Sequence, residues 1–162
     1  MTVPDLNDQA ALRAWRDATL YRKLLRASRA EAAQTLAGIH QRGFTDVTLT
    51  DTTLLANLDT AGSSVTDLAR RAGVTRQSAS QQVAALVKAG YLTAQTSPTD
   101  RRASLVIQTD KGRELLATAL EVVAALEAQY ATALGPRRHA QLHHALDALL
   151  DHGDPDGGLP TP

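Results

Sequence analysis

The sequence has 162 residues, 43% of them hydrophobic, no cysteine and a formal net charge of zero. A chain of this length can bury one good core, with or without an extension. The absence of cysteine excludes disulfides, thiolate metal ligands and thiol-based redox sensing. No apolar run approaches the ~20 residues that cross a bilayer. The first residues also lack a basic stretch followed by an apolar one, so we expect a soluble, cytoplasmic protein without a signal peptide.

The zero net charge hides an asymmetry along the chain. Residues 1–63 carry seven basic and seven acidic side chains. Residues 64–113 carry eight basic and three acidic side chains, a net charge of +5, and residues 114–162 carry two and seven, a net charge of −5. A basic middle segment indicates a surface that faces a polyanion. Charge alone does not decide this, because exposed helices are often basic by chance.

The first third of the chain is rich in Ala, Leu and Arg, which favours helices. We predict a long helix from about Asp8 to Gln41, continuous or interrupted, that ends near Gly43. A shorter helix is predicted from about Asp51 to Leu58, with Thr50 as its N-cap. The leucines predicted to face inward from this helix are Leu54, Leu55 and Leu58.

The next segment, SVTDLARRAGVTRQSASQQVAALVKAGYL, predicts two short helices joined by a turn. Ser64 and Thr75 are suited to cap them. Gly73 ends the first helix because the sharp turn needs a residue that tolerates positive φ, and Gly90 ends the second. The predicted core positions of the pair are Val65, Leu68, Ala69, Ala72, Ala79, Val83, Leu86 and Val87. This arrangement is a helix-turn-helix.

Two strands are predicted next, Tyr91 to Gln95 and Ser104 to Gln108, around a turn at Pro98 to Asp100. A helix-turn-helix followed by a hairpin is a winged helix. Thr109 and Asp110 then begin a long helix. Gly135-Pro136 ends this helix and begins the last one, because proline suits the first turn of a helix. The predicted apolar stripes are Leu116, Leu120, Val123, Leu126 and Tyr130 on the first of these helices and Leu142, Leu146, Leu149 and Leu150 on the second. The segment DHGDPDGGLPTP is expected to be disordered.

The second helix of the pair carries DNA-reading side chains on its first two turns. Arginine bonds guanine bidentately in the major groove, and glutamine bonds adenine in the same way. Serines near a helix N-terminus suit phosphates. The residues predicted to contact DNA from this helix are Thr75, Arg76, Gln77, Ser78, Ser80 and Gln81. A merely solvated helix face is the alternative.

The hairpin tip places Arg101 and Arg102 side by side. Arginine inserts well into a narrow and strongly negative minor groove, so we expect both to contact DNA. Asp100 would repel phosphate if left free, so its expected task is to brace an arginine and hold the wing in shape.

The segment from residue 64 to 113 resembles the MarR family of bacterial transcriptional regulators, and the helix order of the whole chain agrees. The specific pattern is Asp100-Arg101-Arg102, then Val106 to Thr109, then Gly112. The resemblance implies that Arg102 is the minor-groove arginine, Asp100 its bracing acid, and Arg76 to Gln81 the major-groove reader. The chain departs from the family pattern at Gln108, where leucine is usual, and at Ser97.

The implied fold class is α+β and mostly α, a winged helix-turn-helix whose N- and C-terminal helices form an intertwined dimerisation region. The expected parts are residues 1–42 and 114–151 for dimerisation, 43–113 for DNA binding, and 152–162 as a disordered tail. The implied function is a homodimeric repressor on a pseudo-palindromic double-stranded operator, released by a small aromatic or other organic effector. The family binds aromatic acids near the positions of Trp15, Tyr21 and Arg22, although packing explains Trp15 equally well.

Histidines near the C-terminus are candidate metal ligands. His139 and His143 stand four residues apart, a spacing that can hold a metal. Because no acid lies on the same turn, we expect a solvated helix, no metal and no cofactor. No set of residues indicates catalysis, so we expect no enzyme. Two other interpretations are a winged-helix protein-interaction module without DNA binding and a small metal- or ligand-dependent enzyme.

Overall fold

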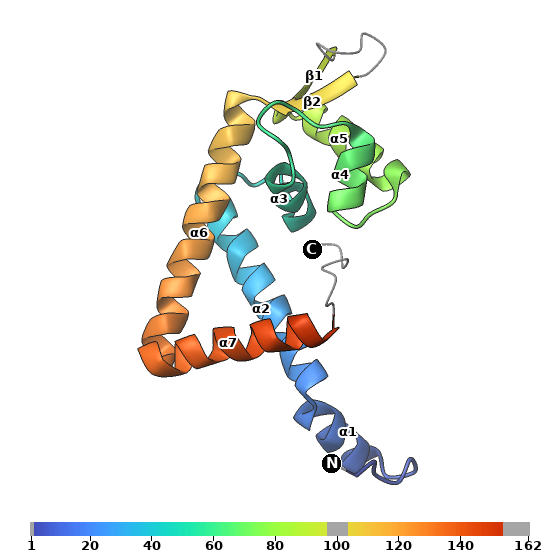
Figure 1. Cartoon of the computed structure of the whole chain (residues 1–162), viewed down its shortest axis with the longest axis vertical. Helices are drawn as coiled ribbons and strands as arrows, with labels where there is room; N and C mark the ends of the chain where they lie inside the picture. Colours follow the sequence, from blue (N-terminus) through green and yellow to red (C-terminus); the bar gives the residue numbers. More distant parts are fainter. Residues whose placement is uncertain (1, 97–103, 154–162) are drawn as a thin grey trace.

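The computed structural model describes residues 2–96 and 104–153. The helices are α1 (Gln9–Ala18), α2 (Leu20–Gln41), α3 (Leu49–Ala56), α4 (Val65–Arg71), α5 (Arg76–Lys88), α6 (Asp110–Leu134) and α7 (Pro136–Gly153), and the strands are β1 (Leu92–Thr96) and β2 (Ser104–Gln108). Figure 1 shows α3, α4, α5 and the hairpin gathered into a lobe at one end. Long α2 and α6 run from that lobe to α7, and α1 projects beyond it. The predicted winged-helix fold, α+β and mostly helical, is confirmed.

The first long helix is interrupted once, at Thr19. Asp8 caps α1 by accepting from the N–H groups of Ala10 and Ala11. Thr19 has an extended backbone, with φ −67° and ψ 146°, and its hydroxyl accepts from the N–H of Arg22 at 3.2 Å. One residue therefore ends α1 and caps α2.

Helix α3 begins two residues before the predicted start. Thr48, not Thr50, is its N-cap, and a capping box joins it to Asp51. The backbone N–H of Thr48 donates to Asp51 Oδ2 at 2.8 Å, and the N–H of Asp51 donates back to Thr48 Oγ1 at 3.3 Å. The carboxylate three residues along satisfies a second free donor, which is why Thr48 is favoured over Thr50.

The helix-turn-helix has the predicted caps. Ser64 and Thr75 accept hydrogen bonds from the first turns of α4 and α5, and Gly73 in the turn has φ 64°. The side chains of the pair that the core buries are Leu68, Ala69, Ala79, Val83 and Leu86. The prediction that Val87 is buried is wrong: it is 39% exposed. Val83 and Leu86 already face the core, and the next residue is turned about 100° away from Leu86.

The hairpin is anchored to the start of α4. Strands β1 and β2 pair antiparallel from Leu92 opposite Gln108 to Thr96 opposite Ser104. Ser63 extends the sheet, because its N–H donates to the carbonyl of Val106 at 3.0 Å and its carbonyl accepts from Val106 at 2.9 Å. This bridge ties the base of the wing to the helix-turn-helix.

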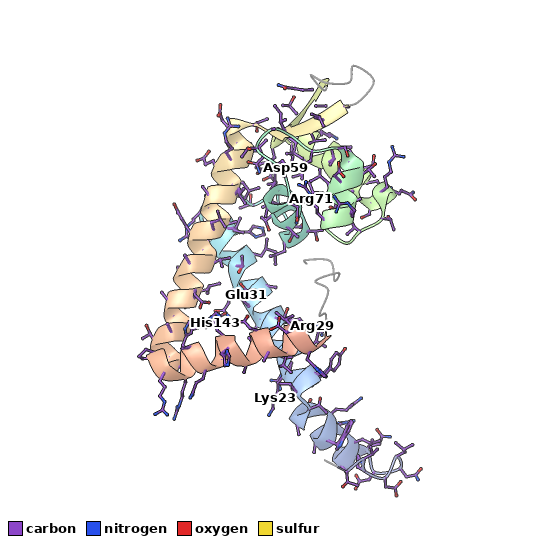
Figure 2. All side chains as sticks on the ribbon, viewed as in Figure 1. Lys23, Arg29, Glu31, Asp59, Arg71 and His143 are labelled. Carbon is purple, nitrogen blue, oxygen red and sulfur yellow. The ribbon has the colours of Figure 1, made fainter. Side chains whose placement is uncertain are left out.

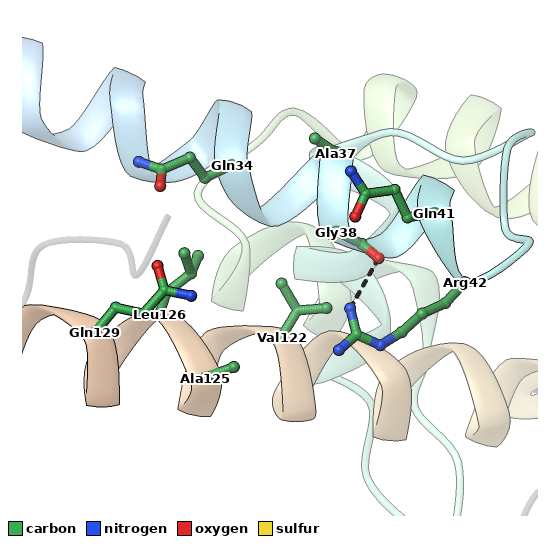
Figure 3. Close-up of a pocket in the computed structure, with 9 residues that line it drawn as sticks. All are labelled: Gln34, Ala37, Gly38, Gln41, Arg42, Val122, Ala125, Leu126 and Gln129. Atoms are coloured by element: carbon green, nitrogen blue, oxygen red, sulfur yellow. Dashed lines mark hydrogen bonds between the residues drawn. The ribbon is translucent and has the colours of Figure 1, made fainter.

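Helices α2 and α6 connect the lobe to the rest of the molecule. At their contact Gly38 meets Val122 so closely that a Cβ on the glycine would lie 2.7 Å from a valine methyl. Figure 3 shows the two helices there, with the Arg42 guanidinium turned back to the carbonyl of Gly38 at 3.0 Å. Because glycine has no side chain, the backbones of α2 and α6 can approach closely and the two long helices pack against each other there.

The apolar stripes of α6 and α7 differ from the prediction. The buried apolar side chains of α6 are Leu115, Ala119, Val122 and Leu126, of which only Leu126 was in the predicted stripe. Leu120 and Val123 are 61% and 43% exposed. On α7, Leu142, Leu149 and Leu150 are also exposed, and none of the eighteen residues of α7 is buried in the single chain. Helix α6 thus has two apolar sides, and only one is covered by its own chain. Helix α7 continues to Gly153, two residues into the predicted tail, and residues 154–162 lie outside the described part of the chain.

Candidate nucleic-acid interface

Helix α5 separates its polar and apolar side chains onto opposite sides. Ala79, Val83 and Leu86 anchor it in the core. The predicted DNA-contacting residues that the structure leaves exposed are Thr75, Arg76, Gln77, Ser80 and Gln81, and Ser78 is half-buried. The exposed residues follow the spacing of one helix side, so they lie together on a rigid element.

The N-terminus of α5 is open to solvent at the same side. Thr75 Oγ1 accepts from the backbone N–H of Ser78 at 3.1 Å, which fixes where the helix begins. The remaining first-turn N–H groups and the helix dipole favour an anion there. A phosphate beside Arg76 and Gln77 would position the glutamine against a base edge.

Two of the basic residues near α5 have partners within the lobe. Arg71 donates to the carbonyl of Asn57 at 3.1 Å and to Asp59 Oδ2 at 2.8 Å, and Figure 2 shows the two charged side chains side by side. The hydrogen bond from Arg71 lowers the pKa of the Asp59 carboxyl. Arg70 lies 3.5 Å from Asp67. Arg71 therefore fastens α4 to the loop after α3.

Two further basic residues hold the start of α6. Lys111 Nζ donates to the carbonyl of Ala89 at 2.9 Å, lies 3.9 Å from the centre of the Tyr91 ring and is 3.7 Å from Asp46. Arg113 donates to the carbonyl of Gln108 at 3.0 Å and pairs with Asp110. The net charge of +5 therefore overstates the basic surface available to DNA, because several of the basic side chains that contribute to it have partners inside the lobe.

The same junction sets the position of the wing. The Tyr91 hydroxyl, on a side chain that is 1% exposed, donates to Asp46 Oδ1 at 2.5 Å. This bond lowers the pKa of Asp46, and burial of the phenol together with the carboxylate raises the pKa of Tyr91. Thr109 Oγ1 lies 2.6 Å from the carbonyl of Gly90 and accepts from the N–H of Gly112 at 3.1 Å. The end of α5, the start of β1 and the start of α6 are thus joined at one corner.

Gln108, one of the two departures from the family pattern, has a structural role. Its Nε2 donates to the carbonyl of Leu55 at 2.9 Å, so β2 is tied to α3. A leucine at this position could not make that hydrogen bond.

The predicted wing residues Asp100, Arg101 and Arg102 lie outside the described residues. The strands that carry them are described, and β1 leaves directly from the end of α5. Their roles in the minor groove and as a brace stay predictions.

The predicted effector residues lie at the junction of α1 and α2. Trp15 is half-buried, and its indole Nε1 is buried with no hydrogen-bond partner among the described residues. Tyr21 is 74% exposed, and Arg22 lies 3.6 Å from Asp17. The cavities described along α2 are lined by residues from Lys23 onward. The prediction for these three residues therefore rests on the family resemblance.

Sequence reasoning identified His139 and His143 but missed the acid that meets them. Glu127 of α6 meets His139 and His143 of α7, with its Oε1 2.7 Å and 2.8 Å from their Nε2 atoms. The hydrogen bond from His143, with that from His139, lowers the pKa of Glu127. The acid absent from the histidine turn is supplied by the neighbouring helix, twelve residues before His139, a separation that local spacing cannot reveal.

Within the described residues, no helix is long and apolar enough to cross a membrane.

A helix-turn-helix with an exposed polar reading helix and a hairpin beside it defines a winged-helix DNA-binding protein. The MarR family model matches residues 45–103, the segment from just before α3 to the residue before β2. Over that segment the chain resembles the MarR family of transcriptional regulators. Comparison with curated proteins gives no match.

Solved structures give the same fold over most of the chain. The transcriptional repressor CouR, bound to a 23-mer DNA duplex, is 28% identical with a TM-score of 0.67, over 81% of this chain and 92% of that one. RV1404 from Mycobacterium tuberculosis is 27% identical with a TM-score of 0.68, over 83% and 91%. CouR from Rhodococcus jostii RHA1, bound to p-coumaroyl-CoA, is 18% identical with a TM-score of 0.68, over 86% and 94%, and shows the fold alone.

Proposed function

We propose that this chain is a homodimeric repressor of transcription. It binds duplex DNA with α5 in the major groove and the wing in the minor groove. The observation that carries the proposal is the exposed row of Arg76, Gln77, Ser80 and Gln81 on a helix whose other side is buried. Arg101 and Arg102 belong to the proposed interface, with Asp100 as their support. A repressor of this kind works in the cytoplasm, where bacterial DNA lies.

The uncovered apolar side chains support a dimer built from residues 1–42 and 114–151. They gather on the helices outside the DNA-binding lobe: Leu20, Tyr21, Leu24, Leu120, Val123, Leu134, Leu142, Leu149 and Leu150 are each 38% or more exposed. Apolar surface of this kind indicates a contact with another chain. A two-fold dimer sets two copies of α5 about one DNA turn, roughly 34 Å, apart and so favours a pseudo-palindromic operator.

A cavity of about 430 Å³ between α2, α3 and α6 supports release by an organic effector. Its walls include Leu116, Leu120 and Val123 from α6 and Thr52 and Ala56 from α3. It lies where the lobe meets the long helices, so a molecule bound there would change the separation of the two reading helices. A CouR structure holds p-coumaroyl-CoA, which shows that this fold accommodates an organic ligand.

The test of DNA binding is its salt dependence. The full-length chain is titrated against a random duplex by fluorescence anisotropy from dilute to physiological salt. If two reading helices and two wings meet phosphates, affinity falls with a log–log slope of about −0.9 per phosphate neutralised. Arg76→Ala leaves one phosphate fewer neutralised in each half of the dimer, so the slope becomes shallower by about one for each of these phosphates.

The matched control is Arg137→Ala, which removes the same charge from the exposed start of α7, away from the lobe. Its salt slope should equal that of the parent. A flat salt response of the parent, or equal changes in the two variants, contradicts the proposal and favours a protein-interaction module.

A further inference from the structure

Three metal-ligand atoms from two helices converge at the corner between α6 and α7. Glu127 Oε1 lies 2.7 Å from His139 Nε2 and 2.8 Å from His143 Nε2, and the two nitrogens are 3.3 Å apart. Among the described residues this is a group of side chains that could hold a metal ion together. From these contacts we propose that the cluster is a binding site for a divalent transition-metal ion, with Zn²⁺ as the ion to test. The proposal does not depend on DNA binding.

The distances fit the size of such an ion. Zinc binds histidine nitrogen at about 2.0–2.1 Å and carboxylate oxygen at about 2.0–2.2 Å. The circle through the three ligand atoms has a radius of about 1.7 Å, given their separations of 2.7, 2.8 and 3.3 Å. A point about 1 Å out of their plane is therefore about 2 Å from each of them. Very little movement is needed to admit an ion.

The donor set also fits. Histidines four residues apart on a helix present their rings on one side, the arrangement that zinc-binding helices use. Two imidazole nitrogens and one carboxylate oxygen suit first-row divalent ions and leave a position open for water. His139 is 20% exposed and His143 55%, so the cluster is partly buried with a side that faces solvent.

The cluster lies in the wall of a cavity. The three residues line a cavity of about 650 Å³ between α2, α6 and α7, whose wall also includes Glu31. Figure 2 shows Glu31 on α2 and His143 on α7 in the same region of the molecule. An ion here would fasten α7 to α6 across Gly135, at a corner where α7 buries no residue of its own. The site would fix the angle of α7, a helix proposed to form the dimer.

The test is calorimetric titration of Zn²⁺ into the untagged full-length chain after removal of metals with a chelator. We expect one ion per chain. His143→Ala and Glu127→Gln should each lower the affinity at least tenfold. Zn²⁺ should also raise the melting temperature of the parent, because a ligand that binds the folded state stabilises it, and this rise should shrink in both variants.

The matched control is His144→Ala, on the residue next to His143 and exposed on the same helix. It should bind Zn²⁺ like the parent. Circular dichroism of each metal-free variant separates loss of the site from loss of the fold. If Glu127→Gln binds as tightly as the parent, the histidines act only as a surface pair and the proposal is wrong. Absence of binding to a folded parent also overturns it and leaves a hydrogen-bonded cluster of two imidazoles on one carboxylate.

Discussion

At the residue scale, the basic side chains of the lobe divide into two groups. Arg71, Lys111 and Arg113 donate to carbonyls and carboxylates of their own lobe. Arg76 and the glutamines beside it project into solvent from the first turns of α5. A count of charges cannot make this distinction, because it depends on which carbonyls the fold brings within reach. Arg76 is one of eight basic residues in the segment 64–113, but it contributes more to a DNA-binding surface than the residues that have partners within the lobe.

Substitutions in the base-contacting residues of α5 and in the wing should change DNA binding in different ways. Gln77→Ala or Gln81→Ala removes paired hydrogen bonds to one base, which costs about 1–3 kcal/mol at one operator position and relaxes the preference there. Arg102→Ala removes an interaction that responds to groove width and potential, so it should weaken specific and random duplexes alike. The measurement is a titration of each variant against an operator selected from random duplexes, a single-base mismatch and a random duplex.

Gln141→Ala and Arg137→Ala are the matched controls, since both residues are exposed on α7. Asp100→Ala should resemble Arg102→Ala but more mildly, because the acid only positions its neighbour. Melting temperatures show whether each variant folds. If Arg102→Ala binds all three duplexes like the parent, the wing does not contact DNA.

At the element scale, the corner between β1 and α6 determines where the wing stands relative to α5. Thr109 and Gly112 are recognisable in the sequence as parts of a wing pattern. The structure gives the physical reason for the glycine: a Cβ there would lie 2.1 Å from the carbonyl oxygen of Tyr91. That oxygen accepts from the N–H of Thr109 at 3.0 Å, so it cannot move away without breaking that hydrogen bond.

Gly112→Ala should therefore destabilise the protein, although alanine is the better helix former by about 1 kcal/mol. The clash involves backbone rather than a flexible side chain, and overpacking of this kind costs about 1–3 kcal/mol. Gly153→Ala at the end of α7 is the control, because a Cβ there meets nothing within 4 Å. Urea denaturation of both variants measures the difference. A Gly112→Ala protein as stable as the control would mean that the corner has room to relax.

Elements that depend on local chemistry could be predicted from the sequence. Ser64 and Thr75 are N-caps as predicted, and Thr109, predicted to begin the long helix with Asp110, is its N-cap, because each is a short polar residue just before an amphipathic run. The start of α3 was missed because two threonines compete, and only the capping box with Asp51 decides between them. Glu127 could not be placed beside the histidines, since that contact depends on the angle between two long helices.

At the scale of the whole molecule, the single chain exposes apolar side chains that a stable monomer would bury. The predicted stripe of α6 follows an apolar side that is real but faces away from its own core, with Leu120 at 61% exposure. Periodicity indicates that a helix side is apolar, and it does not say which chain covers it. Figure 1 shows α6, α2 and α7 as the three sides of a triangle. A second copy of the chain would cover these faces.

The last prediction tests that dimer on α7. Leu149 and Leu150 are 43% and 62% exposed, and α7 buries no residue in the single chain, so changing both to aspartate leaves the described core intact. The charges would lie in the proposed interface, where burial without a partner is costly. We expect sedimentation velocity to show a monomer whose helical content equals that of the parent. Its affinity for a pseudo-palindromic operator should fall steeply, since the two half-sites are no longer bound by linked copies. Gln141→Asp, an exposed and polar position of the same helix, should remain dimeric. If the double variant sediments as a dimer like the parent, the contact lies elsewhere on α1, α2 or α6, and the role assigned to α7 is wrong.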